Sequence, residues 1–172
     1  MAANDLQHLY LNAVRKARAP LTVYMGMKKA PTPTGELASF DSFALLLRPD
    51  RGPVQFIYKQ AVAALATTPA ALAAVQQVFQ GTIRDANTLQ DQVLQALIAE
   101  RLAVSAFLRT GSRVAGTLLA YDQYTLVMSV GDEINLVYKH ALASLIPERN
   151  PDLRAITEPR ETEAMSISDS SA

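Results

Sequence analysis

Apolar side chains recur at steps of three and four residues in two stretches of the chain, which predicts two amphipathic helices. The first stripe covers residues 6–17 and stops ahead of Pro20, with Asp5 placed to act as its N-cap. The second stripe covers residues 89–98 and follows Thr88, a second cap residue. We therefore expect two short helices of similar design, one near the start of the chain and one beyond its middle.

Short β-prone runs, separated by turns rich in glycine and proline, follow each helix. Strands this short, joined by tight turns, favour a small curled barrel. We expect a mainly β fold with short α elements, in which each barrel unit has one N-terminal helix and about five strands. The expected strands are residues 21–25, 34–40, 43–48, 54–58 and 62–66 after the first helix, and 103–109, 113–120, 124–129, 134–138 and 142–146 after the second.

The two halves of the chain are copies of one module, because a short phrase recurs together with its surroundings. Tyr58-Lys59-Gln60-Ala61 returns as Tyr138-Lys139-His140-Ala141. The offset between the copies falls from 83 to 80 positions, and the breaker-rich residues 29–33 and 49–53 account for the slips as loop insertions. The other matching pairs, in preserved order, are Leu6 and Leu89, Gln7 and Gln90, Tyr24 and Phe107, Gly35 and Gly116, Phe40 and Tyr121, Asp41 and Asp122, and Phe43 and Tyr124.

The segment between the copies predicts a helix, and the end of the chain does not. Thr68 and Pro69 form a cap and a first-turn proline, and Gly81 marks a stop, so we expect a linker helix over residues 69–80 that holds the modules at a fixed separation. The tail is rich in Pro, Glu, Ser and Thr. We expect a first module at 4–66, a linker at 67–86, a second module at 87–147 and a disordered acidic tail at 148–172.

Charge is distributed unevenly although the 172 residues carry 16 basic and 16 acidic side chains. From residue 147 onward three basic residues face six acidic ones, so the tail carries −3 and the preceding chain +3. Residues 1–66 hold eight Lys or Arg against four Asp or Glu, whereas residues 89–146 hold four against five. The first copy is therefore the cationic one, which matters for a polyanionic partner.

Several classes of protein are disfavoured by composition. The chain has no cysteine, and its two histidines have no acidic cluster beside them, so we expect no metal and no other cofactor. The sequence contains neither a Gly-rich phosphate loop nor a spaced set of nucleophile, base and acid, so nothing in it suggests an enzyme. The sequence shows neither a signal segment nor a membrane-spanning run, so we expect a cytoplasmic protein without membrane contact.

The size of each module predicts self-association. About sixty residues make a marginal core because little surface is buried at that size. A curled sheet also leaves edge N–H and C=O groups unpaired. Pairing with neighbouring modules satisfies both needs, and we expect an oligomer on this ground.

Three markers in the chain resemble those of Hfq, the bacterial Sm-like RNA chaperone family. They are the Leu-Gln-x-x-x-Leu that opens each helix, the turn Phe40-Asp41-Ser42-Phe43, and the closing Tyr138-Lys139-His140. The resemblance implies a helix on a strongly bent five-stranded antiparallel sheet, of which six copies close into a ring. A tandem pair then completes a pseudo-hexamer as a homotrimer, and its partners are single-stranded RNAs, both small regulatory RNA and mRNA.

The resemblance implies that uridine-rich RNA binds the helix-bearing face around the pore. Aromatic rings there stack with bases, while lysines and amides meet phosphates and base edges. The lysines also converge on one pore, and such a ring of cations favours an anion. The matching residues are Gln7, Ser42, Phe43, Tyr58, Lys59 and Gln60 in the first copy, and Gln90, Gln123, Tyr124, Tyr138, Lys139 and His140 in the second.

Two further surfaces follow from the same resemblance. A basic rim that promotes RNA annealing matches Asn12, Arg15, Lys16, Arg18 and Phe40 in the first copy, whereas the second copy has Gln95, Ile98, Ala99 and Arg101. Annealing should accordingly be weaker than in an all-basic ring. On the distal face, where the family binds adenine-rich RNA, the matching residues are Tyr24, Gln55, Phe107, Gly111, Arg113 and Asn135. The proline-bearing insertion after Met27 lies in this region.

Structural roles compete with each of these assignments. Half-buried aromatics on strands are more often core than base platforms, and Arg15, Lys16 and Arg18 also suit any solvated helix face. We interpret Asp41 and Asp122 as turn residues that bind backbone N–H groups. The sequence therefore leaves two functions open: an RNA-binding ring that acts in post-transcriptional regulation, and an Sm-like structural or protein-interaction ring with reduced or lost RNA binding.

Overall fold

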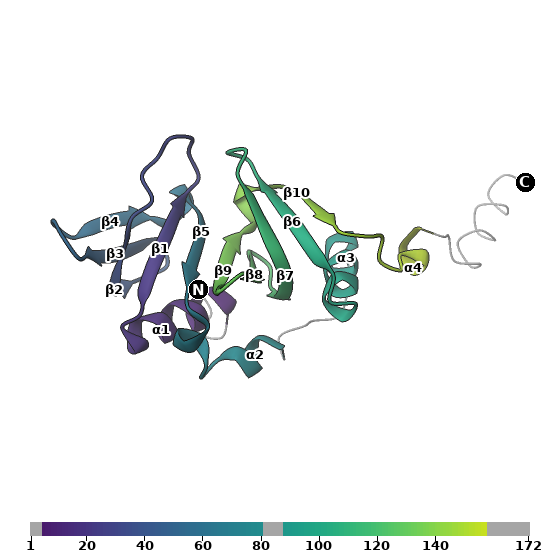
Figure 1. Ribbon diagram of the computed structural model, residues 1–172, viewed down its shortest axis with the longest axis horizontal. Coiled ribbons are helices and arrows are strands. Elements are labelled where there is room, and N and C mark those ends of the chain that lie inside the picture. The colour runs from purple at the N-terminus through teal and green to yellow at the C-terminus, as the bar shows by residue number, and fades with distance from the viewer. Residues whose placement is uncertain (1–4, 81–87, 158–172) are drawn as a thin grey trace, which may run out of the picture.

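Two similar modules follow one another in the computed structural model, which describes residues 5–80 and 88–157 (Figure 1). The first consists of α1 (Leu6–Ala17), β1 (Pro20–Met25), β2 (Thr34–Phe40), β3 (Ala44–Pro49), β4 (Gln55–Tyr58) and β5 (Val62–Thr67), and the second of α3 (Leu89–Ala99), β6 (Ala103–Leu108), β7 (Arg113–Tyr121), β8 (Thr125–Val130), β9 (Glu133–Tyr138) and β10 (Leu142–Pro147). All ten predicted strands are present, each within one residue of its predicted ends. The predicted fold class is confirmed.

Both helices begin at the predicted caps. The Asp5 side chain accepts a hydrogen bond from His8 N at 2.7 Å, and Thr88 Oγ1 accepts one from Asp91 N at 3.1 Å. Helix α1 ends at Arg18, whose φ of 51° is left-handed and whose N–H closes the last turn. The sequence pattern therefore fixes both the start and the length of each helix.

Each module is a five-stranded antiparallel sheet, bent sharply along its second strand. The strand order is β5-β1-β2-β3-β4 in the first module and β10-β6-β7-β8-β9 in the second. The register shifts between Leu37 and Ser39 in β2, and between Leu118 and Ala120 in β7. Two residues before each shift, a glycine lets the backbones approach closely, since a Cβ on Gly35 would collide with Arg48 O and one on Gly116 with Ser129 O.

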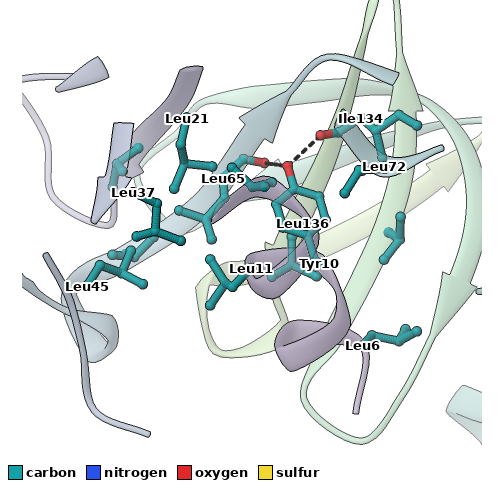
Figure 2. Packing of buried hydrophobic residues seen from close by; sticks show 14 of the residues in the cluster. Leu6, Tyr10, Leu11, Leu21, Leu37, Leu45, Leu65, Leu72, Ile134 and Leu136 are labelled. Carbon is teal, nitrogen blue, oxygen red and sulfur yellow. Dashed lines mark hydrogen bonds between the residues drawn. The ribbon is translucent and has the colours of Figure 1, made fainter. Parts of the chain in front are cut away.

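The two modules join edge to edge into one ten-stranded sheet. Strand β5 of the first module pairs with β9 of the second, with Leu65 opposite Leu136. Among the described residues, β4 and β10 form the two free edges of this sheet. Helix α1 packs at the junction, and its Tyr10 hydroxyl donates to Ile134 O at 2.7 Å and lies 3.4 Å from Leu65 O (Figure 2). One core cluster therefore crosses the junction and includes Leu136 and Tyr138 of the second module.

The linker differs from the single helix that the sequence predicted. It forms a 3₁₀ turn, η2 (Pro69–Leu72), and a separate short helix, α2 (Gln76–Gln80). The interruption accompanies burial of both Leu72 and Phe79 in a core cluster that includes residues of both modules. The modules are also held by direct strand pairing rather than spaced apart by the linker, because pairing satisfies the backbone groups of both edges.

The start of the tail contacts the second module. Residues 148–157 include α4 (Arg154–Thr157), and Asp152 N donates to Glu100 Oε2 at 2.8 Å, beside an ion pair of 3.4 Å between Arg149 and Glu100. Residues 148–157 are therefore structured, whereas the sequence predicted disorder over residues 148–172. The predicted helix stop at Gly81 and the tail beyond residue 157 lie outside the described residues. No helix within the described ranges has the length and apolar character needed to cross a membrane.

Candidate nucleic-acid interface

The pore-face residues of the two modules meet at the junction between α1 and the end of β9. The Tyr138 hydroxyl donates to Gln7 Oε1 at 2.6 Å, and its ring stacks on His140 with centroids 5.3 Å apart. His140 Nε2 lies 3.0 Å from Val62 O across the junction. Burial raises the pKa of the Tyr138 hydroxyl, so Tyr138 acts as a neutral donor between the modules. It is buried in this arrangement and does not present an open platform for a base.

The pore lysines lie in partly desolvated positions just after β4 and β9. Lys59 is buried and Lys139 is half-buried, and desolvation lowers the pKa of both. The carboxylates of Asp5 and Asp41 oppose this shift at Lys59, and those of Asp91 and Asp122 oppose it at Lys139. The two modules thus build the same cationic position with one matching acid, Asp41 or Asp122, and one that differs, Asp5 or Asp91.

In each module, one aromatic side chain projects outward from the turn before the third strand. Phe43 is 77% exposed and Tyr124 is 63% exposed. Asp41 Oδ1 accepts hydrogen bonds from Phe43 N and Ala44 N, each at 2.8 Å. In the matching turn, Asp122 Oδ1 accepts one from Tyr124 N at 2.9 Å. These hydrogen bonds lower the pKa of Asp41. The turn role predicted for both aspartates is confirmed, and it leaves two rings open for stacking.

Three of the twelve predicted pore-face residues meet at the internal junction, and their three counterparts do not. Gln7, Tyr138 and His140 form the junction described above, whereas their counterparts Gln90, Tyr58 and Gln60 lie at the two outer edges of the chain. Tyr58 is 58% exposed, against 4% for Tyr138. The remaining predicted residues, Ser42 and Gln123, are exposed in the same turns as Phe43 and Tyr124.

The predicted rim residues line one side of the first module. Arg15, Lys16 and Arg18 are exposed, and an Arg15 guanidinium nitrogen donates to Asn12 Oδ1 at 2.9 Å. A pocket of about 360 Å³ lies here, bounded by His8, Asn12, Arg15, Ser39, Phe40, Asp41 and Ser42. The second module carries one cation on the matching helix surface, Arg101 at the end of α3.

The predicted distal-face residues divide into two groups. Tyr24, Arg113 and Asn135 line a pocket of about 490 Å³ between the modules, together with Lys28 and Lys29 of the inserted loop. Asn135 is buried, and its Oδ1 has no hydrogen-bond partner among the described residues. Gln55, Phe107 and Gly111 do not line this pocket. The insertion therefore adds cations to the junction pocket.

Sequence reasoning did not single out some of the residues that shape these sites. Tyr121 holds Lys139 near its ring, and Lys28 and Lys29 were treated as part of an interruption. The match of Tyr121 to Phe40 in the repeat was the available signal for the first. No signal in the sequence indicates that Lys28 and Lys29 line a pocket, because that pocket depends on the strand pairing between the modules.

Comparison with known proteins places both modules in one family. Residues 6–72 and 89–152 each match the family model described as Hfq protein. The RNA-binding protein Hfq of Leptospira biflexa is 31% identical over 75 residues, 44% of this chain and 90% of that protein. The protein of the same name from Hyphomonas neptunium is 45% identical over 64 residues, 36% of this chain and 73% of that protein.

Solved structures include a similar protein as well. A crystal structure of the pleiotropic translational regulator Hfq is 28% identical, with a TM-score of 0.33, and covers 34% of this chain and 97% of that one.

Proposed function

This chain belongs to the Hfq family as a tandem of two modules, and we propose that three chains close head to tail into a pseudo-hexameric ring that binds single-stranded RNA. The ring uses the junction already present inside each chain as its template. If β10 of one chain pairs with β4 of the next as β5 pairs with β9, then Leu145 lies opposite Phe56. Every sheet edge is then paired, and closed cyclic symmetry results.

The exposure of matched residues supports this assembly. Leu6 and Leu136 are fully buried at the internal junction, whereas their counterparts Leu89 and Phe56 are 66% and 59% exposed at the outer edges. Large apolar side chains at such positions favour a partner surface. The same side chains that seal one junction within the chain are thus available to seal the other between chains.

The closed ring gathers the pore-face residues of all six modules around one opening. Three copies each of Lys59 and Lys139 meet there, with Phe43 and Tyr124 exposed nearby. Closely placed cations favour a polyanion, and exposed rings favour stacking on unpaired bases. We propose uridine-rich segments of small regulatory RNA and mRNA as the ligands, and post-transcriptional regulation in the cytoplasm as the role.

The observation that carries the proposal is that matching apolar residues are buried at the internal junction and exposed at the two free edges of the chain. Light scattering tests the ring, with an expected mass of about 56 kDa, three times the 18.6 kDa of one chain. A mass of one chain at micromolar concentration would contradict it.

Fluorescence polarisation with a labelled oligouridylate tests the ligand in the same sample. We expect salt-sensitive binding that falls when Lys59→Ala and Lys139→Ala are combined. A ring of the expected mass that does not bind RNA would favour a structural or protein-interaction ring instead.

A further inference from the structure

Both pore lysines lie against an aromatic ring. Lys59 Nζ is 5.6 Å from the centroid of the Phe40 ring, and Lys139 Nζ is 5.6 Å from that of Tyr121. Both distances fall within the range of about 6 Å over which a ring face attracts an ammonium group. The identity of the ring differs between the modules while the distance is the same, so the contact depends on the aromatic face and not on the tyrosine hydroxyl.

Each ring is itself held by the helix of its module. The Phe40 ring meets His8 of α1 edge to face, with centroids 5.6 Å apart at 64°. The Tyr121 hydroxyl lies 3.4 Å from Asp91 O, in the first turn of α3. The two helices therefore fix the surfaces on which the lysines lie.

We propose that Phe40 and Tyr121 are positioning residues that hold the pore lysines in place for RNA, an inference that rests on the proposed RNA-binding function. A lysine side chain has a flexible four-carbon stem, and holding it in advance lowers the entropic cost of binding an anion. An aromatic face attracts the ammonium without neutralising it, so the ring can position the lysine and the ammonium keeps its charge for a phosphate.

This role extends that of Phe40, which the family resemblance assigns to the rim. Phe40 bounds the rim pocket on one side and contacts Lys59 on the other. Tyr121 similarly bounds a pocket of about 230 Å³ that Lys139 also lines. Phe40 thus lies at both the rim pocket and the cationic pore position, whereas Tyr121 shares a single pocket with Lys139.

A double-mutant cycle separates positioning from a merely structural role. Affinity for a labelled oligouridylate is measured for Phe40→Leu in the wild-type background and in the Lys59→Gln background, where Lys139 maintains measurable binding. We expect Phe40→Leu to weaken binding by roughly three- to tenfold when Lys59 is present and to have no effect when it is absent. Phe40→Leu in a Lys139→Gln background should still weaken binding, because Lys59 remains.

Equal losses in both Lys59 backgrounds would overturn the proposal, since Phe40 would then act through the rim or through packing. Phe40→Tyr keeps an aromatic face beside Lys59 and is the conservative variant, in which the affinity lost in Phe40→Leu should be regained. If the wild-type ring binds no oligouridylate, the proposed function fails, and the lysine geometry is tested alone by NMR. We expect ring-current shifts of the Lys59 and Lys139 ε-methylene protons, and random-coil shifts would refute the contact in a way that no folding defect of a variant can obscure.

Discussion

Asp122 of the second module accepts a hydrogen bond from Leu6 N, the first residue of α1 in the first module, at 3.0 Å. Its other carboxylate oxygen holds the Tyr124 turn, so one side chain fixes a local turn and a helix start in another module. The counterpart Asp41 holds its own turn in the same way. In the proposed ring the second oxygen of Asp41 meets Leu89 N of the next chain.

Replacing each aspartate by asparagine separates the two junctions. Asp122→Asn leaves one acceptor oxygen for two sites, so either the Leu6 N–H or the Tyr124 turn loses its acceptor, and we expect a loss of about 1–2 kcal/mol in the free energy of unfolding. Asp41→Asn makes the same change at an outer edge. We expect it to raise the concentration at which rings dissociate, measured by light scattering during dilution. Identical effects of the two variants on ring dissociation would contradict the proposed head-to-tail closure.

The Tyr10 hydroxyl gives a second test of the internal junction. It is buried and donates to Ile134 O at 2.7 Å, and Val93 takes its place in the second module. We expect Tyr10→Phe to lower the free energy of unfolding by about 1 kcal/mol in urea titration. Tyr24→Phe, at a tyrosine that is 37% exposed, is the matched control and should leave it unchanged. Unchanged stability of Tyr10→Phe would show that the hydroxyl contributes nothing to the junction.

The elements of the fold were predictable from the sequence because their signals are local. The apolar stripes and caps defined α1 and α3, and the repeat confirmed each strand of one copy by its counterpart. The repeat also paired Gly35 with Gly116, both of which prove to lie at close backbone contacts. Independent local signals that agree are strong evidence for one structure.

The pairing between the modules could not be read from the sequence. Asp41 and Asp122 stand in nearly identical surroundings in the chain, yet only Asp122 contacts another module. The same holds for Tyr58 and Tyr138, of which one is exposed and one buried. Their difference arises from which sheet edges meet inside the chain, and that is a property of the topology. The break in the linker also depends on the topology, because Leu72 and Phe79 are buried in a core to which both modules contribute.

Glycine in the second strand of each sheet is a further point of sensitivity. A Cβ on Gly35 would collide with the backbone of β3, which cannot move without disturbing the strand ladder. We expect Gly35→Ala to cost about 3 kcal/mol or more in the free energy of unfolding. At Gly52, φ is 93° and the space around it is open, so Gly52→Ala should cost only about 1 kcal/mol through backbone strain. Thermal unfolding of both variants compares the two mechanisms, and a smaller loss at Gly35 would contradict the close contact.

Annealing of RNA pairs tests the unequal rims. Only the first module carries Arg15 and Lys16 on its helix, whereas Ile98 and Ala99 occupy the matching positions of the second. In the proposed ring three of six rims are therefore cationic. We expect Arg15→Ala with Lys16→Ala to slow annealing of two complementary RNAs by about tenfold or more at low salt, while affinity for oligouridylate at the pore is kept.

The reverse change gives a gain of function. Ile98→Arg with Ala99→Lys makes all six rims cationic, and we expect the annealing rate to rise by about twofold or more, with a steeper dependence on salt because more phosphates are contacted. Ile98→Gln with Ala99→Gln adds polarity without charge and is the matched control. Stopped-flow fluorescence of a labelled RNA pair measures the rates. An annealing rate unchanged by the added cations would show that RNA does not reach the rim of the second module. The asymmetry between the copies would then have no role in annealing.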